Sequence, residues 1–225
     1  MESPHEFRTA EREHHSILSS LEKRALIWIA QRLPSWVTSD QLTILGFVAL
    51  IGVGLSYWCA RFSPAGLLWV IVFFALNWFG DSLDGTLARV RQKQRPRYGF
   101  YVDHVLDACG SVFVFGGLAA SGYMSERIAV GLLIAYCLLS IEVYLATYTV
   151  GKFHLSFAMF SPTELRLLLI VGNIALVFHP YALIAGHQYR LFDVGGVIGI
   201  IGIAIALLVS IAKHTCYLYN AERLS

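Results

Sequence analysis

Long apolar stretches dominate the chain from residue 41 onward. Six of them, each about 18–24 residues long, are long enough to cross a ~30 Å hydrocarbon layer as helices. They cover residues 41–60, 65–88, 99–121, 127–149, 164–183 and 194–215. Backbone polar groups in lipid need partners within the chain, and no stretch alternates as a barrel strand does. The pattern predicts an all-α, polytopic membrane protein with six transmembrane helices.

The residues before the first stretch follow a different pattern. Between Ile17 and Leu33, apolar residues such as Trp28 are interleaved with charged residues such as Glu22 and Arg24. This predicts an amphipathic helix on the membrane surface, which Pro34 ends. The sequence therefore divides into an N-terminal cytoplasmic segment, residues 1–40, and a transmembrane domain, residues 41–225.

Composition supports a membrane protein. Apolar residues make up 56% of the chain and charged residues only 14%, whereas a soluble domain carries about 25% charged residues. This excludes a disordered chain and an ordinary soluble globule. The four cysteines, Cys59, Cys109, Cys137 and Cys216, lie in apolar segments without paired spacing. We expect them to be small buried hydrophobic residues, and not a disulfide framework or a zinc site.

The distribution of basic residues predicts the orientation. Fourteen of the 17 Lys and Arg residues fall at one set of alternate ends of the six stretches, and only Arg61, Arg127 and Arg190 fall at the other. The positive-inside rule then places both termini in the cytoplasm. The first apolar stretch begins late and behind a charged segment, so we expect no cleaved leader.

Four aspartates are the most informative charges, because a carboxylate near a membrane interior is costly. Asp81 and Asp84 are spaced i, i+3 near the cytoplasmic end of the second stretch, and Asp103 and Asp107 are spaced i, i+4 near the start of the third. Each pair shares one helix face, and antiparallel helices bring both pairs to one depth. No basic residue lies within a turn, so we expect a divalent cation, or two, of the Mg²⁺, Mn²⁺ or Ca²⁺ type.

Small residues and an arginine accompany these acids. Gly85 allows close approach of a ligand, Ala88 lies one turn beyond Asp84, and Arg89 offers a fork for a phosphate oxygen. Gly99 lies four residues before Asp103, where a side chain is expected to crowd the acidic site. Together these residues indicate a pocket for a nucleotide pyrophosphate.

The complete pattern resembles the signature of the CDP-alcohol phosphotransferase family. It reads Asp81-x-x-Asp84-Gly85-x-x-Ala88-Arg89, nine residues, then Gly99-x-x-x-Asp103-x-x-x-Asp107. The spacer after Arg89 is one residue longer than the family's commonest form. The six-helix layout with an N-terminal surface helix also matches.

The resemblance implies a role for each motif residue. Asp81, Asp84, Asp103 and Asp107 are expected to hold two Mg²⁺ or Mn²⁺ ions, and Asp107 to act as the general base. Gly85, Ala88 and Arg89 are expected to contact the CDP group. Thr43 remains from a weaker family stretch before the first span, so the resemblance makes it a candidate nucleotide contact. Helix capping by Ser39 or Asp40 explains that stretch equally well. The implied partners are a CDP-alcohol donor, a lipid or polar alcohol acceptor, membrane lipids and a second copy of the chain, with no nucleic acid.

The substrates stay open within the family. Some members join a CDP-linked lipid to a water-soluble alcohol, and others transfer phosphocholine or phosphoethanolamine to diacylglycerol. Asp103-His104 resembles the second group, and His104 is either a further catalytic group or a histidine facing a neighbouring helix. Lys152 and Arg166 are candidates for binding a phosphorylated acceptor. Glu142, inside the fourth stretch, binds a cationic headgroup or bonds Tyr144, Thr147 or Arg166.

Two other functions compete with this enzyme. A divalent-cation transporter explains the four aspartates but not the fixed spacing of Gly85, Ala88, Arg89 and Gly99. An inactive relative serving as a scaffold is disfavoured because every motif position is intact.

Overall fold

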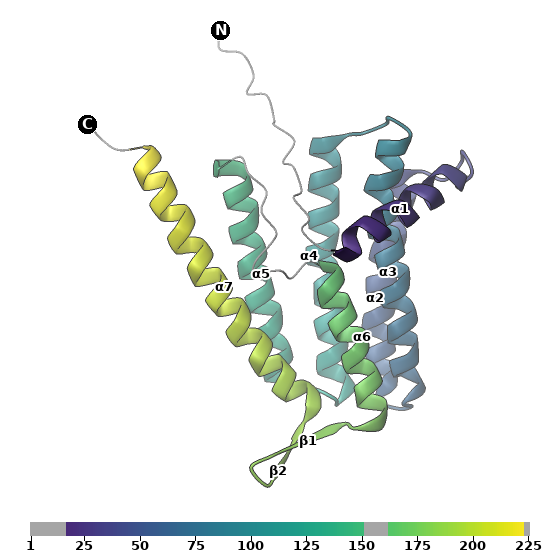
Figure 1. Cartoon of the computed structure of the whole chain (residues 1–225). Coiled ribbons are helices and arrows are strands. Elements are labelled where there is room, and N and C mark those ends of the chain that lie inside the picture. Colours follow the sequence, from purple (N-terminus) through teal and green to yellow (C-terminus); the bar gives the residue numbers. More distant parts are fainter. Residues whose placement is uncertain (1–16, 151–161, 223–225) are drawn as a thin grey trace.

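The chain folds into a bundle of long helices, seen in a computed structural model that describes residues 17–150 and 162–222 (Figure 1). The helices are α1 (Ile17–Arg32), α2 (Ser39–Ala60), α3 (Ala65–Val90), α4 (Pro96–Ser121), α5 (Glu126–Val150), α6 (Pro162–Phe178) and α7 (Leu191–Ala221). One antiparallel hairpin of β1 (Tyr181–Ile184) and β2 (His187–Arg190) precedes α7. Among the described residues, five helices are long and apolar enough to cross a membrane: α2, α3, α4, α5 and α7.

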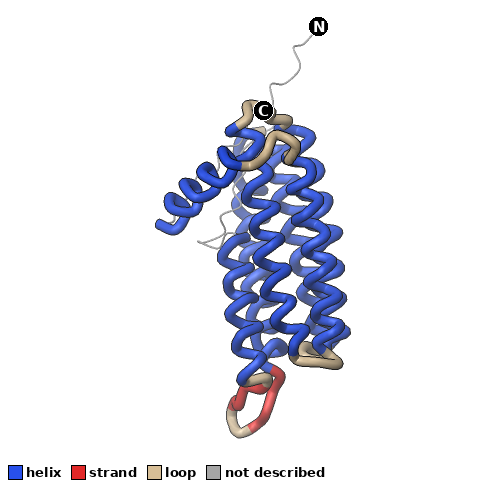
Figure 2. Tube along the Cα trace, turned by 90° about the vertical axis from the view of Figure 1, so that its right-hand side faces the viewer, coloured by secondary structure: helices blue, strands red, loops and turns tan. Residues whose placement is uncertain are grey.

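The helices from α2 to α7 run alternately up and down, so the bundle has two distinct ends (Figures 1 and 2). We call them the α1 end, where α2 and α4 begin and α3, α5 and α7 finish, and the hairpin end. Helix α2 packs against α3 and α4, α6 packs against α3, and α5 packs against α4 and α7. The elements that carry the four aspartates, α3 and α4, therefore both flank α2.

Glycines let α2 and α4 approach backbone to backbone. A Cβ atom on Gly54 would overlap the carbonyl of Phe113, and one on Gly117 would overlap the carbonyl of Gly54. Beside Gly54 on α2, the side chains of Val53 and Tyr57 are fully buried in the core. Close contact through small residues is the common way in which membrane helices associate.

The predicted span over residues 164–183 is wrong at its C-terminal end. Helix α6 ends at Phe178, and its 17 residues extend about 26 Å at 1.5 Å per residue. The sequence His179-Pro180 stops the helix because proline lacks an N–H and disfavours the helical conformation of the preceding residue. The apolar residues that follow form strand β1, and Ala185 and Gly186, with φ of 50° and 81°, form the two-residue turn to β2.

Helix α1 confirms the helix predicted before the first span, and it lies obliquely across the outside of the bundle (Figure 2). Leu26 and Ala30 are buried with Leu83 and Leu87 of α3. The indole Nε1 of Trp78 donates to Glu22 Oε1 at 2.8 Å. Leu26 and Ala30 are thus covered by protein, while the amphipathic character of the helix and its place on a membrane surface stay predictions.

A second anchor holds the segment between α1 and α2. The guanidinium of Arg91 donates to the carbonyls of Leu33 and Pro34 at 3.0 and 2.8 Å, and also to that of Val37. Arg91 therefore fixes the entry of the chain into the bundle, next to the end of α3 that carries the motif.

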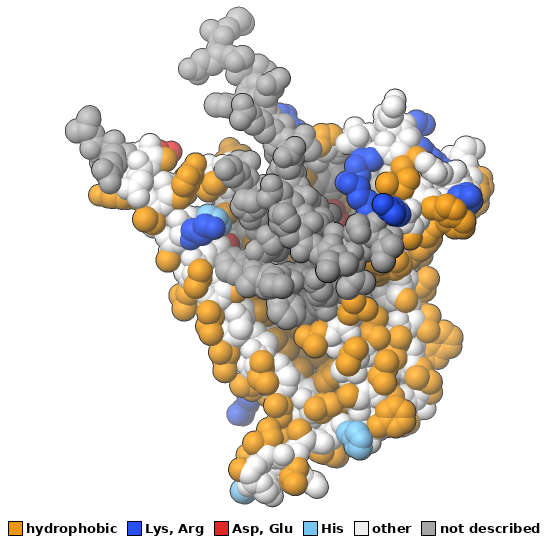
Figure 3. Space-filling model, in the orientation of Figure 1, with side chains coloured by type: hydrophobic (Ala, Val, Ile, Leu, Met, Phe, Trp, Pro, Cys, Tyr) orange, Lys and Arg blue, Asp and Glu red, His pale blue; other side chains and the backbone are white. Residues whose placement is uncertain are grey.

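Apolar side chains cover the sides of the bundle (Figure 3). On α5 and α7 many large ones are exposed: Ile134, Leu138, Ile141 and Leu145, and Ile198, Ile201, Ile205 and Leu208. Such a surface is typical of helices that contact lipid or another subunit. The prediction that the cysteines are buried is wrong for three of them, because Cys59, Cys109 and Cys216 are exposed; all four are free thiols.

Candidate active site

Three of the four motif aspartates come together at the α1 end. Carboxylate oxygens of Asp81 on α3 and of Asp103 and Asp107 on α4 all lie within 4.8 Å of one another, and all three residues are half-buried. The antiparallel course of α3 and α4 brings the i, i+3 and i, i+4 pairs to one depth, as the sequence predicts. Like charges this close destabilise one another unless a cation balances them.

Asp84 lines the same pocket, and its carboxylate is held by different neighbours. Thr43 Oγ1 on α2 donates to Asp84 Oδ2 at 2.6 Å, and the backbone N–H of Gly85 donates to Oδ1. Ser39 Oγ donates to the Asp84 carbonyl at 2.9 Å. The start of α2 therefore holds the Asp84 side chain, while a contact of Thr43 with a nucleotide stays a prediction.

A basic residue from a distant part of the sequence reaches the cluster. Arg166 Nη2 on α6 lies 2.6 Å from Asp81 Oδ2, and both side chains are mostly buried. The sequence offers the acids no basic partner within a turn, but the packing of α6 against α3 supplies one. Lys152, the other predicted acceptor residue, lies outside the described residues.

Residues of α2 and α3 complete the floor of the pocket. Gly46 and Phe47, together with Asn77, line it beside the aspartates. Asn77 is buried and donates from Nδ2 to the Gly46 carbonyl at 3.0 Å, while its Oδ1 has no partner among the described residues. The sequence interpretation missed Asn77, although a lone amide inside an apolar stretch is a signal of a buried polar role.

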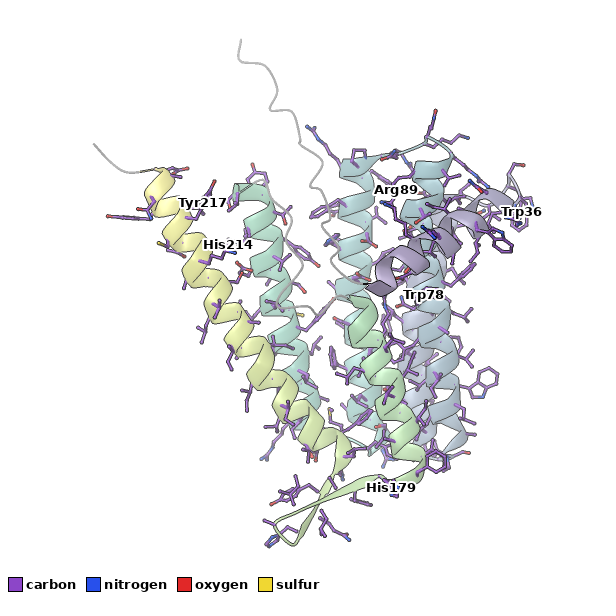
Figure 4. The ribbon with its side chains drawn as sticks, viewed as in Figure 1. Trp36, Trp78, Arg89, His179, His214 and Tyr217 are labelled. Carbon is purple, nitrogen blue, oxygen red and sulfur yellow. The ribbon has the colours of Figure 1, made fainter. Side chains whose placement is uncertain are left out.

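The small motif residues face open space. A Cβ atom at Gly85 or Gly99 would meet nothing within 4 Å among the described residues. A Cβ atom at Gly99 would therefore not crowd the aspartate side chains, contrary to the expectation from the sequence. The exposed Arg89 donates to Thr86 Oγ1 at 3.2 Å near the end of α3 (Figure 4). The contact of Gly85 and Arg89 with a nucleotide stays a prediction.

His104 packs between α4 and α5. Its ring stacks on Phe100 at 4.1 Å between centroids and meets Tyr144 edge-on at 4.9 Å. Its Nδ1 lies 2.7 Å from the Phe100 carbonyl and 3.7 Å from Asp103 Oδ2. This matches the interpretation that His104 faces a neighbouring helix, and it also keeps the ring beside the acidic cluster.

Glu142 pairs with a residue that the sequence interpretation did not consider. Its Oε1 lies 2.7 Å from Nδ1 of His214 on α7 (Figure 4), so the predicted structural partners Tyr144, Thr147 and Arg166 are wrong. Glu142 Oε2 is buried without a hydrogen-bond partner in the described part of the chain. The pair joins the two helices, and only a comparison of residues 72 positions apart could have found it.

The predicted helix caps are also corrected. Thr38 is the N-cap of α2: its Oγ1 accepts from the N–H of Gln41 at 3.2 Å, and Gln41 Oε1 accepts from the N–H of Thr38 at 2.8 Å. Ser39 bonds the Asp84 carbonyl instead, and Asp40 pairs with Arg95, whose pKa this hydrogen bond raises. Neither residue caps the helix, because the reciprocal capping box is completed one position earlier.

The chain is similar to curated transferases. It is 26% identical to cholinephosphotransferase 1 of Danio rerio over 191 residues, which cover 76% of this chain and 48% of the relative. It is 29% identical to archaetidylinositol phosphate synthase of Pyrococcus horikoshii over 86 residues, covering 38% of this chain and 43% of the relative. The matched segment thus spans about half the length of each relative.

A solved structure shares the fold. The phosphatidylinositol phosphate synthase of Mycobacterium tuberculosis, crystallised with CDP-DAG bound, superposes with a TM-score of 0.60 at 19% identity, over 90% of this chain and 99% of that one. The family model described as CDP-alcohol phosphatidyltransferase matches residues 36–211, which include α2 to α5, the acidic pocket and most of α7. The chain therefore belongs to the CDP-alcohol phosphatidyltransferase family.

Proposed function

We propose that the protein is an integral membrane CDP-alcohol phosphotransferase of phospholipid synthesis. It transfers a substituted phosphate from a CDP-alcohol to an acceptor hydroxyl and releases CMP. The observation that carries this proposal is the meeting of Asp81, Asp103 and Asp107 within 4.8 Å, in a pocket that Asp84 also lines. The family match over the same helices supports it.

The donor set fits divalent metal ions. All the candidate ligands are carboxylate oxygens, which suit Mg²⁺ and Mn²⁺ and not zinc. Asp81, Asp84, Asp103 and Asp107 would hold two ions. When bound, these ions neutralise the pyrophosphate and stabilise the CMP leaving group.

The chain's own residues bind the donor, hold the acidic side chains in place and accept the proton of the acceptor. Arg89 donates to a phosphate oxygen of the donor, and the open space at Gly85 admits the nucleotide. Asp107 accepts the proton of the acceptor hydroxyl, whose oxygen forms a bond to the phosphorus bearing the non-nucleoside group. The bond from that phosphorus to the CMP oxygen breaks, which gives a phosphodiester and CMP. Thr43 keeps Asp84 in place during this step.

Two substrate pairings compete within the family. Phosphocholine or phosphoethanolamine transfer to diacylglycerol is supported by the match to a cholinephosphotransferase over 76% of this chain and by the Asp103-His104 dipeptide. Transfer from a CDP-linked lipid to a phosphorylated polyol is supported by Arg166 beside the pocket and by the match to archaetidylinositol phosphate synthase. Purified protein offered a panel of both donor and acceptor types, with the product lipid identified by mass spectrometry, decides between them.

The first prediction tests the acidic cluster. Asp84→Asn and Asp107→Asn should each lower CMP release at least 100-fold, because the first removes a metal ligand and the second the general base. Activity of the unaltered protein should vanish in EDTA and return with Mg²⁺ or Mn²⁺. Glu126→Gln, which removes an exposed acid at the hairpin end, is the matched control and should keep full activity.

A result of full turnover in chelator-treated membranes contradicts the proposal. Uptake of Mn²⁺ into sealed vesicles without CMP release would favour a cation transporter instead.

We also propose that the protein forms a homodimer with its active sites at the cytoplasmic face. The exposed apolar faces of α5 and α7 offer area for a second copy, and the basic residues at the α1 end support that orientation. Native mass spectrometry from detergent should give a mass of two chains.

A further inference from the structure

A groove of about 320 Å³ lies at the hairpin end, at the opposite pole of the bundle from the acidic pocket. Three connections meet there: the one after α2, the one between α4 and α5, and the hairpin. Arg61 follows α2, Ser121 ends α4 and Tyr123 follows it, and the hairpin contributes Tyr181 and Arg190 to the lining. The motif and the proposed reaction make no use of this site.

Its charge is what distinguishes the groove. Among the Lys and Arg residues that the structure describes, only Arg61, Arg127 and Arg190 belong to the hairpin end, and Arg61 and Arg190 line the groove. No carboxylate lines it, and neither guanidinium forms an ion pair or a hydrogen bond with a described residue. A concave surface with two arginines and no balancing acid attracts an anion.

The backbone around the groove is fixed by specific contacts. Arg190 is directly opposite Tyr181 in the hairpin, and the Leu191 N–H donates to the Pro180 carbonyl at 3.0 Å. On the other wall, buried Ser121 Oγ accepts from the Tyr123 N–H at 3.1 Å. These contacts fix the backbone on both sides of the groove, including the backbone of Arg190.

The geometry points to a phosphate group as the ligand, and we propose that the groove binds the phosphate of a phospholipid headgroup in the leaflet at the hairpin end. Arginine forks match phosphate oxygens in pairs, and tyrosines such as Tyr123 and Tyr181 are the side chains that favour the headgroup depth of a membrane. The exposed Phe62, next to Arg61, offers apolar surface for the acyl chains. This proposal rests on the membrane position of the helices and not on the proposed catalytic activity.

Lipid binding to the full chain in detergent, measured by native mass spectrometry with phosphatidylglycerol, tests the site. We expect Arg61→Gln and Arg190→Gln each to weaken binding by roughly tenfold or more, because each removes charge-assisted hydrogen bonds. Arg61→Lys keeps the charge without the planar fork, so its lipid binding should be intermediate between that of the unaltered protein and that of Arg61→Gln. Arg127→Gln is the matched control: it removes an exposed arginine at the same end outside the groove, and should change binding less than twofold.

Two further probes identify the source of the phosphate. Diacylglycerol, which has no phosphate, should not bind in an Arg61-dependent manner, and inorganic phosphate at millimolar concentration should not displace the phospholipid. Arg61-dependent binding of inorganic phosphate with no retained phospholipid would overturn the lipid assignment in favour of a free anion. Equal weakening by Arg127→Gln and Arg61→Gln would overturn the site itself, since general surface charge then explains the attraction. Equal melting temperatures of the variants exclude a folding defect.

Discussion

Arg166 changes how the acidic cluster is balanced when no metal is bound. Its guanidinium lies 2.6 Å from Asp81 Oδ2 and so balances the charge of one of the three clustered carboxylates. Because both side chains are mostly buried, losing one partner should cost more than it would in a surface ion pair, although solvent still screens the pair. We therefore expect Arg166 to stabilise the metal-free pocket and to compete with a metal ion for Asp81.

Replacing this arginine should expose the competition. Arg166→Gln should lower the stability of the metal-free protein by about 1–3 kcal/mol, because Asp81 loses its partner. Added Mn²⁺ should raise the melting temperature more in the variant than in the unaltered protein. The melting temperature in detergent with and without EDTA measures both effects, and an equal metal-induced rise in the two proteins would contradict the role given to Arg166.

A substitution at Gly85 can distinguish an effect on ligand binding from an effect on stability. A Cβ atom there meets no described atom within 4 Å, and alanine is favoured over glycine inside a helix by about 1 kcal/mol. Gly85→Ala should therefore keep or slightly raise the melting temperature while it lowers CMP release at least tenfold. Gly116→Ala, also in open space on a helix, should give the same stability gain with unchanged activity. Full activity of Gly85→Ala would show that the donor does not approach this residue.

At the scale of helices, the packing of α2 against both α3 and α4 assembles the pocket. Thr43 reaches Asp84 from α2, and Asp103 reaches Asp81 from α4. Helices α2 and α4 cross where Gly54 and Gly117 let their backbones approach, and both helices carry pocket residues. Widening this crossing should therefore affect the pocket as well as stability.

Two adjacent glycines provide a matched test. Gly117→Ala places a methyl group against the Gly54 backbone, and an overpacked backbone contact costs about 1–3 kcal/mol. Thermal unfolding in detergent should show a clear loss for Gly117→Ala and none for Gly116→Ala. Equal melting temperatures for the two variants would mean that the helices are not in contact at this point.

The sequence predicts the helices and the acidic cluster because both depend on local periodicity. Apolar length indicates α2 to α5 and α7, and i, i+3 and i, i+4 spacing places Asp81 beside Asp103 once antiparallel packing is assumed. Contacts between distant helices leave no such periodic signal. Arg166 with Asp81 and His214 with Glu142 are separated by 85 and 72 positions. The predicted span missed the hairpin because it followed the apolar residues of 164–183 across Pro180, although the helix ends at Phe178.

At the scale of the molecule, charge asymmetry predicts the orientation. Among the described residues, ten Lys and Arg residues belong to the α1 side of the bundle: Lys23, Arg24, Arg32, Arg89, Arg91, Lys93, Arg95, Arg97, Arg166 and Lys213. Only three belong to the hairpin end: Arg61, Arg127 and Arg190. The positive-inside rule predicts that the side rich in basic residues lies in the cytoplasm, which is also where the proposed nucleotide donor would be supplied. Topology and proposed chemistry therefore require the same orientation.

Cysteine labelling tests this orientation directly. In a chain with its four native cysteines replaced by alanine, Gln188→Cys reports on the hairpin and Lys93→Cys on the connection between α3 and α4, and both positions are exposed. A membrane-impermeant maleimide added to intact cells should label residue 188 at once and residue 93 only after permeabilisation. The reverse order would place the acidic pocket outside the cytoplasm, away from its proposed nucleotide donor. Because the two positions lie at opposite poles of one bundle, simultaneous labelling of both in intact cells would instead contradict a transmembrane arrangement.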